Sequence, residues 1–328
     1  MIIDSHGHLV PPALLHTMKA NQAKFPSVRM IEEGASLAFS FAGNKPTRPV
    51  SKPLTDIAAR IAWMDQNKID RQVVGGWVDS FGYEIPGEEG VAWSAMINEA
   101  LLAASSEHKR FVPLATVPMQ DGAKAAQVLK KAMADGFPGA MIGTLPRGVG
   151  SVLDTEDLEP FWKAADETGA AIHIHPSFDA GDHRVHDYGM ANGVGRITDA
   201  MVAVSRLVYS GHLVKYKNAK VVVGMGGAGL PFIIGRLRRN AAITPNLGDP
   251  DEALRHLYVD TILHDARVLR FVAEIVGADR IMMGTDMPFP IGDDKPLELV
   301  KAAGFGESEA KSIDGGLAAK IFRVQEVV

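Results

Sequence analysis

The sequence has no cysteine among its 328 residues. This absence excludes disulfide bonds, a thiol nucleophile and a structural zinc site built from thiolates. The chain also lacks a run of 18 apolar residues, so no segment is expected to cross a membrane. Its first residues lack the succession of basic, apolar and small residues that is typical of a signal peptide, which favours a cytoplasmic location.

Positive charge is also scarce. Lys and Arg number 34 against 39 for Asp and Glu, which gives a net charge of −5, and no basic block is long enough to follow a phosphate backbone. Nucleic acid is therefore not an expected partner. The hydrophobic content of 46% is enough for a large core, and we expect residues 1–328 to form a single domain.

Short apolar segments alternate with helical patterns along the chain. The apolar segments cover residues 2–8, 72–77, 110–118, 139–144, 170–176, 220–227, 257–262 and 281–286. The helical patterns cover residues 54–67, 91–106, 121–134, 158–168, 194–213, 231–240, 265–276, 297–303 and 307–322. This alternation predicts an α/β protein with a (β/α)8 TIM barrel.

One stretch departs from the alternation. Pro11 and Pro12 end the first strand, and residues 12–55 form an irregular stretch that is too long for an ordinary βα loop. We interpret it as a functional insertion, a small hairpin or a lid, which carries Arg48.

Histidines and one aspartate lie at the ends of three predicted strands. His6 and His8 end the first strand, His173 and His175 end the fifth, and Asp286 ends the eighth. Alternate residues of a strand point to the same face, and barrels place their chemistry at the C-terminal ends of the strands. Imidazole nitrogens with one carboxylate oxygen and an open position suit a catalytic divalent metal ion. A structural alternative for either His-x-His pair is two hydrogen-bonded core histidines.

With these residues in place, the chain resembles the amidohydrolase superfamily, and within it the branch of metal-dependent decarboxylases typified by aminocarboxymuconate semialdehyde decarboxylase. The resemblance covers nearly the whole chain. Its carriers are Ile3-Asp4-Ser5-His6-Gly7-His8 with Pro11, residues 60–66, 136–139, 142–144, 174–176, 230–232 and 235–236, and Gly284-Thr285-Asp286-Met287-Pro288-Phe289-Pro290.

The resemblance implies a barrel of the metal-dependent hydrolase type. It further implies that His6, His8, His175 and Asp286 bind one divalent ion, with zinc expected first and manganese or iron as alternatives. It also implies a homodimer and a small carboxylate-bearing substrate. Arg48 matches an arginine that binds the substrate carboxylate in this family, and Arg236 matches one that is donated across the dimer interface; the alternative for both is a solvated surface arginine.

One position departs from the family pattern. The sixth strand of the family ends in a block with a histidine that transfers protons, whereas this chain has Gly224-Met225-Gly226-Gly227. A thioether cannot take up a proton, so Met225 is expected to line the substrate site without acting as a base. Losing a positioned general base typically costs about 10²- to 10⁴-fold in rate. Another residue has taken over this role, or the reaction has changed.

Several side chains could replace the missing imidazole. His173 shares a strand with His175, and His264 follows the seventh strand; each could instead be structural. His183 and His186 lie in a loop over residues 179–192, where solvated histidines are common. Arg196 follows that loop and could add positive charge for an anionic substrate or form a structural ion pair. Asp286 could itself carry the proton.

These residues leave three hypotheses open. The first is a metal-dependent carboxy-lyase that acts without oxidation on a small unsaturated or aromatic carboxylate, with Arg48 and Arg236 holding carboxylates. The second is a metal-dependent hydrolase or hydratase acting on a cyclic amide, a lactone or a ring-cleavage product. The third is a pseudoenzyme or a subunit that needs a catalytic partner, because Met225 occupies the position of the base.

Overall fold

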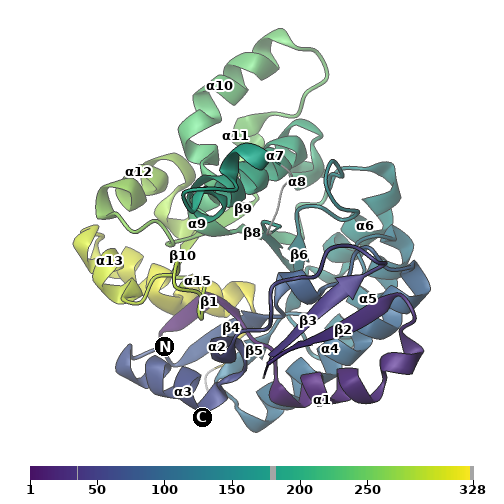
Figure 1. The fold of residues 1–328 in the computed structure, drawn as a ribbon. Coiled ribbons are helices and arrows are strands. Elements are labelled where there is room, and N and C mark those ends of the chain that lie inside the picture. The colour runs from purple at the N-terminus through teal and green to yellow at the C-terminus, as the bar shows by residue number, and fades with distance from the viewer. Residues whose placement is uncertain (35, 178–181, 326–328) are drawn as a thin grey trace.

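The computed structural model describes residues 1–34, 36–177 and 182–325, and parallel strands surrounded by helices form its centre (Figure 1). The parallel strands are β1 (Ile3–His8), β4 (Arg71–Gly75), β5 (Phe111–Pro113), β6 (Gly139–Gly143), β7 (Ala171–His175), β8 (Lys220–Val223), β9 (Leu257–Asp260) and β10 (Ile281–Met282). They pair in the orders β1-β4-β5 and β10-β9-β8-β7-β6. Within each group, every strand therefore pairs with the parallel strand that comes next along the chain.

Backbone hydrogen bonds at two seams join these two groups of strands. At one seam Ala115 pairs with Ala140, and the Ala115 amide donates to the Gly139 carbonyl at 2.9 Å. At the other seam Gly7 pairs with Met287, and the Ser5 amide donates to the Met283 carbonyl at 2.8 Å. The strands thus follow one another around a ring, which confirms the predicted (β/α)8 barrel.

Helices follow the strands around the outside of this ring (Figure 1). They are α3 (Ile57–Gln66), α4 (Gly87–Glu107), α5 (Gly122–Ala134), α6 (Glu159–Thr168), α7 (Arg196–Tyr209), α8 (His212–Lys215), α10 (Leu230–Ile243), α11 (Pro250–Leu254), α12 (Ala266–Val276), α13 (Pro296–Ala302), α14 (Glu307–Lys311) and α15 (Leu317–Ile321). The prediction of a single helix over residues 194–213 is wrong, because two helices, α7 and α8, cover this stretch. Gly211 has φ of +73°, a left-handed conformation that separates α7 from α8.

The stretch after the first strand is more regular than the sequence indicated. Helix α1 (Pro12–Ala20) begins directly at Pro12, so the expectation of an irregular chain from this residue is wrong. Proline is well suited to the first turn of a helix, because the amide hydrogen that it lacks has no partner there. The stretch also contains an antiparallel hairpin of β2 (Val28–Glu33) and β3 (Ser36–Phe41), followed by the short helix α2 (Lys52–Thr55).

Aromatic side chains attach this hairpin to the barrel. Trp93 on α4 is fully buried, and its ring meets the rings of Phe25, Phe39 and Phe41 at centroid distances of 5.0, 6.0 and 5.8 Å. Edge-to-face contacts of this kind add to the hydrophobic stabilisation of a core. The hairpin and the loop after it are therefore held beside the strand ends.

A buried polar network holds β1 in register. The Asp4 carboxylate accepts from Gln72 Nε2 at 2.7 Å and from Thr285 Oγ1 at 2.5 Å, while Arg60 donates to Gln72 Oε1 at 2.7 Å and to the His8 carbonyl at 3.0 Å. Burial raises the pKa of Asp4 to about 6 against the opposing effect of these hydrogen bonds. The network joins α3, β1, β4 and the chain after β10, and so it orients the histidines of β1.

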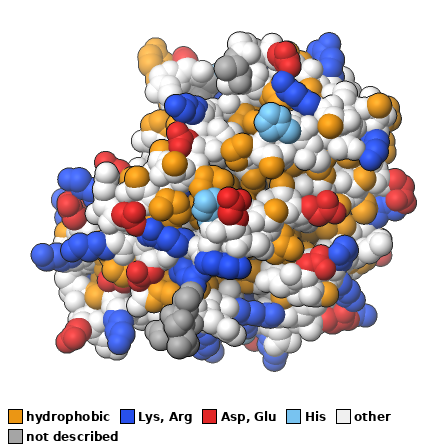
Figure 2. Space-filling model, turned by 90° about the horizontal axis from the view of Figure 1, so that it is seen from below, with side chains coloured by type: hydrophobic (Ala, Val, Ile, Leu, Met, Phe, Trp, Pro, Cys, Tyr) orange, Lys and Arg blue, Asp and Glu red, His pale blue; other side chains and the backbone are white. Residues whose placement is uncertain are grey.

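The surface seen in Figure 2 mixes basic and acidic side chains, with apolar side chains gathered toward its middle. Among the described residues, no helix combines the length and the hydropathy that crossing a membrane requires.

The close contact between β6 and β7 makes a direct test of the barrel packing. A Cβ atom at Gly139 would lie 1.8 Å from the Ala171 carbonyl oxygen. We expect Gly139→Ala to destabilise the chain by about 3 kcal/mol or more, as overpacking against backbone does. Urea unfolding measures this. The matched control is Gly235→Ala on α10, where nothing lies within 4 Å of the new Cβ atom. Equal stability of the two variants would contradict the packing described here.

Candidate metal centre

Side chains from three strand ends meet at the mouth of the barrel. His6 and His8 lie on β1, His175 ends β7, and Asp286 follows β10, and one potential ligand atom from each lies within 4.8 Å of the others. Asp286 Oδ1 is 3.1 Å from His8 Nε2, 3.6 Å from His6 Nε2 and 4.0 Å from His175 Nε2. The fold therefore brings together the four residues that the sequence singled out.

The other ring nitrogen of each histidine is held by an acceptor. His8 Nδ1 lies 3.2 Å from the Gly76 carbonyl oxygen, and His175 Nδ1 lies 2.8 Å from the Pro176 carbonyl oxygen. A carbonyl oxygen can only accept, so Nδ1 carries a proton in both rings, and the Nε2 atoms are directed toward Asp286 Oδ1. His6 Nδ1 lies 2.8 Å from Asp260 Oδ2, which fixes the third ring in the same sense.

The charge states of these side chains suit a cation. Burial lowers the pKa of His6 well below its ordinary value and lowers that of His175, so both rings are neutral at physiological pH. Burial alone raises the pKa of Asp286, but the surrounding imidazoles hold it well below its ordinary value. His6 Nε2 is buried and has no hydrogen-bond partner among the described residues. Lone pairs that face one another in this way repel, and the set fits one divalent ion.

Asp260 is a member of this centre that the sequence reasoning missed. It is the last residue of β9 and fully buried, and its Oδ1 accepts from the amides of Gly226 at 3.3 Å and Ile262 at 3.1 Å while Oδ2 faces His6. Burial raises the pKa of Asp260 to about 7. A carboxylate behind a ligating histidine orients the ring and raises its basicity. The signal in the sequence that could have indicated Asp260 is its position as a carboxylate in a predicted strand next to the strands that carry the metal-binding residues.

The other histidines considered as proton donors lie in different surroundings. The ring of His173 is fully buried, meets the His6 ring edge-on at 4.3 Å, and has no hydrogen-bond partner among the described residues. His264 is exposed, has φ of +58°, and is not part of the metal group. His183 and His186 are exposed, and residues 179–181 of their loop lie outside the described part of the chain.

Met225 lies in an unusual backbone segment, and its side chain is partly exposed. The segment α9 (Gly224–Ala228) is a left-handed turn in which Met225 has φ of +54°. Its side chain lines a pocket of about 420 Å³ with Leu263, Phe232 and Phe271, which are apolar. Gly224, directly before it, is packed against His6 and Asp260, since a Cβ there would lie 3.1 Å from atoms of both.

Two arginines lie near the mouth. Arg48 donates through Nε to Asp79 Oδ2 at 3.0 Å and lies 5.7 Å from the centre of the Trp77 ring. Arg196 is 7% exposed, and burial and the charge of Arg48 lower its pKa while Asp286 and Asp79 raise it. A pocket of about 500 Å³ includes Arg48, Asp79, Tyr83 and Ser177 in its lining. The hairpin loop and the strand ends thus enclose a cavity with basic and aromatic groups.

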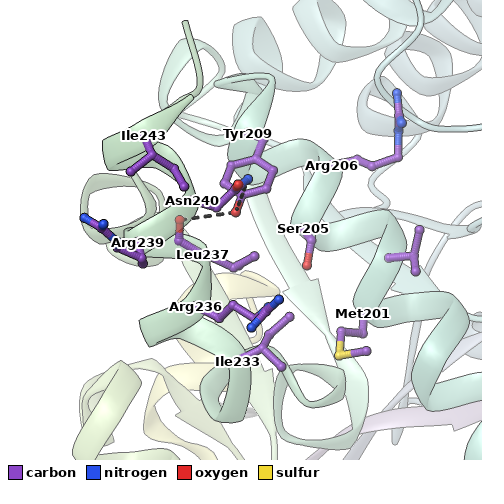
Figure 3. Close-up of a pocket in the computed structure, with 11 residues that line it drawn as sticks. Met201, Ser205, Arg206, Tyr209, Ile233, Arg236, Leu237, Arg239, Asn240 and Ile243 are labelled. Atoms are coloured by element: carbon purple, nitrogen blue, oxygen red, sulfur yellow. Dashed lines mark hydrogen bonds between the residues drawn. The ribbon is translucent and has the colours of Figure 1, made fainter. Parts of the chain in front are cut away.

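Arg236 lies elsewhere. It is exposed on α10 and lines a groove of about 580 Å³ between α7 and α10, beside Ile233 and Leu237 (Figure 3). Tyr209 contributes to the same groove and donates to the Leu237 carbonyl at 3.2 Å. In the chain as described, Arg236 is not among the residues that line the pocket beside Arg48.

The role of Asp260 can be tested without removing a ligand. Asp260→Asn keeps the shape of the side chain but removes the charge behind His6, so we expect divalent metal affinity to fall by about 10- to 100-fold. Competition with a fluorescent chelator measures it. Asp314→Asn is the control, because Asp314 is half-buried and does not belong to any group of described residues that could hold a metal ion. Unchanged affinity in Asp260→Asn would show that this carboxylate does not support the centre.

Comparisons with known proteins agree with this geometry. The family model described as Amidohydrolase matches residues 3–324. The chain is 27% identical over 325 residues to 2-amino-3-carboxymuconate-6-semialdehyde decarboxylase of Dictyostelium discoideum, with 96% of this chain and 90% of that protein covered. Its fold resembles 5-carboxyvanillate decarboxylase of Sphingomonas paucimobilis, with a TM-score of 0.80, 22% identity and 99% of each chain covered. It also resembles a dihydroxybenzoic acid decarboxylase of Polaromonas sp. with bound manganese, with a TM-score of 0.77, 20% identity and coverage of 99% of this chain and 98% of that one. The chain belongs to the amidohydrolase family.

Proposed function

We propose that this protein is a metal-dependent carboxy-lyase that removes carbon dioxide, without oxidation, from a small unsaturated or aromatic carboxylate. The convergence of His6, His8, His175 and Asp286 at the barrel mouth carries the proposal. The decarboxylases among the relatives support this reaction over the others that the family performs.

The four residues would hold one divalent ion, which when bound would orient the substrate and draw electron density from it. Zinc suits a centre of imidazoles and one carboxylate, and the manganese in the Polaromonas relative supports manganese as an equal alternative to zinc, with iron as a third.

Arg196 and Arg48 would bind the substrate carboxylates. A guanidinium offers two parallel donors to a carboxylate, and burial strengthens the interaction because water competes less. Asp79 offsets part of the charge of Arg48 through an ion pair at 3.0 Å, and Arg196 is the more deeply buried of the two arginines. The aromatic lining from Phe41, Phe81 and Tyr83 suits an unsaturated or aromatic ring.

Loss of carbon dioxide breaks the bond between the carboxylate and the substrate, and leaves the electron pair on the substrate carbon. That carbon must then take up a proton. Asp286 is the favoured carrier, because it is 9% exposed at the mouth and lies within the cluster. Its pKa lies well below the ordinary value, so its carboxylate would first accept a proton from water and then pass that proton to the carbon. His173 is 0% exposed behind His6 and is less accessible, while His264 lies on the surface.

Met225 favours hydrolysis or hydration as the second candidate function. Without an imidazole on the sixth strand, the chain lacks the proton carrier of its family at this position. In that case a cyclic amide, a lactone or a ring-cleavage product would be the substrate, and Asp286 would move the proton.

The resemblance and the exposed apolar side chains of α10 also support a homodimer. Phe232 is 83% exposed and Ile243 is 61% exposed, and both lie on the helix that carries Arg236. A dimer formed there would bring Arg236 of each copy toward its partner. We also propose a cytoplasmic location, as expected from the sequence.

The decisive test of the reaction is gas release. Metal-loaded protein incubated with a panel of aromatic and unsaturated carboxylates should release carbon dioxide, as detected by a coupled bicarbonate assay. Asp286→Ala should abolish release and lower the metal content. Proton release without gas would favour hydrolysis, and turnover by metal-free protein would contradict the assignment of the centre.

Substrate anchoring is tested at Arg196. We expect Arg196→Ala to raise KM by about 10- to 100-fold, because a hydrogen bond to a charged group is worth about 1.5–3 kcal/mol. Arg196→Lys should recover only part of the loss, since it keeps the charge but not the paired donors. Arg29→Ala is the control, on an exposed residue of β2. Steady-state kinetics that leave KM of Arg196→Ala unchanged would exclude an anchoring role.

The Met225 position gives a separate test. Histidine tolerates left-handed φ better than most side chains, so Met225→His can fold with its present backbone. We expect the variant to release carbon dioxide about 10-fold or more faster, at the low end of what a positioned proton carrier contributes. Met225→Leu controls for side-chain size. A rate equal to the parent in both variants would indicate that this chain does not use that position for proton transfer.

A further inference from the structure

A second polar cavity lies at the opposite end of the barrel from the metal centre. Its lining includes Lys220, the first residue of β8, Tyr258 near the start of β9, and Arg280 directly before β10. The cavity has a volume of about 470 Å³. The metal centre is at the C-terminal ends of the strands, so this cavity is separate from it by the length of the barrel.

The cavity is strongly basic in an acidic protein. Lys217, Lys220, Arg255 and Arg280 line it, and Glu252 is the one carboxylate in the lining. The whole chain has a net charge of −5, so the local sign is opposite to the overall sign. Like charges that share a cavity repel one another, and an anion would relieve that repulsion.

The cations of this cavity are poorly compensated by the protein itself. Among the described residues, Lys217, Lys220 and Arg255 have no carboxylate within the 4.0 Å of an ion pair. Arg280 reaches its neighbour Asp279 at 3.5 Å and lies 5.2 Å from the centre of the Tyr258 ring. The nearby Asp166 accepts from the amide of Asn218 at 2.8 Å instead.

His256 reports the same positive potential. Burial lowers its pKa first, and the charges of Arg280, Lys217 and Lys220 lower it further, against the opposing effect of Glu252. The neutral imidazole adds a hydrogen-bonding group to the lining without more charge. The cavity thus combines point charges, planar guanidiniums, an imidazole and the Asn218 amide, all of which can donate to an oxyanion.

We propose that the cavity lined by Lys217, Lys220, Arg255 and Arg280 is a binding site for a multivalent oxyanion of phosphate chemistry. A monocarboxylate offers too little charge to balance this set, whereas two linked phosphate groups match it and fit the volume. The N-terminal end of a barrel contributes to stability and not to chemistry. The bound anion therefore stabilises or regulates the barrel and is not a second substrate.

Titration calorimetry of the metal-loaded chain with inorganic pyrophosphate at low ionic strength tests the proposal. Lys217 and Arg255 are exposed, so Lys217→Ala/Arg255→Ala is expected to fold, and circular dichroism checks this. We expect the affinity to fall by roughly 10-fold for each cation removed, as for hydrogen bonds to charged groups. The matched control is Lys19→Ala/Lys24→Ala, which removes two positive charges from the exposed surface near α1.

Melting temperatures give an independent measurement. Pyrophosphate should raise the melting temperature of the parent and of the control, and should have little effect on Lys217→Ala/Arg255→Ala. Equal binding by all three proteins would place the pyrophosphate at the metal centre or on the general surface and would overturn the proposal. Binding of a single-stranded oligonucleotide without binding of pyrophosphate would overturn it as well, in favour of a polymer surface.

Discussion

Three imidazole nitrogens and one carboxylate oxygen are directed at one another within 4.8 Å, and the proposed chemistry of the protein needs this convergence. All three rings have Nδ1 facing a carbonyl or carboxylate oxygen, and a neutral ring held in this way presents a lone pair at Nε2. Such an arrangement is unfavourable by itself and becomes favourable around a cation. The hydrogen bonds of the three Nδ1 atoms, on the far side of each ring, therefore orient the Nε2 atoms for binding a cation.

The barrel is what makes the convergence possible. Its closure sets β1 beside the chain after β10, so His8 and Asp286, which are far apart in the sequence, become neighbours. The hydrogen-bond network of Asp4, Gln72 and Arg60 holds β1 in place, and the carboxylate of Asp260 orients the His6 ring. Rigid strand ends with buried supports hold ligands more firmly than loops can.

Much of this was accessible from the sequence, because strand periodicity and strand-end chemistry are local signals. The strands, the alternation with helices and the two His-x-His pairs with Asp286 at strand ends follow from such signals, whereas the choice of His6, His8, His175 and Asp286 as the ligand set came from the family resemblance. Asp260 was missed, since its partner His6 is distant in sequence and only the closed barrel brings the two together. Pro12 was misjudged for a different reason: proline favours both a chain break and a helix start, and tertiary packing decides between them.

The substrate side was less predictable. Arg48 and Arg196 influence each other through space, and no spacing in the sequence indicates that Asp79 shares their charge. The path of the proton depends on the same spatial information, because His173 within β7 and His264 after β9 were both candidates from the sequence, yet His173 is buried and His264 is exposed. A side chain's surroundings, and not its position along a strand, decide whether it can act.

X-ray absorption spectroscopy on the chain loaded with one equivalent of zinc tests whether these four side chains bind one metal ion. We expect a first shell with three imidazole nitrogens and at least one oxygen, with the outer-shell scattering that imidazole rings produce. A shell made of oxygen alone, or a spectrum that does not change when His6 and His8 are replaced by alanine, would contradict it.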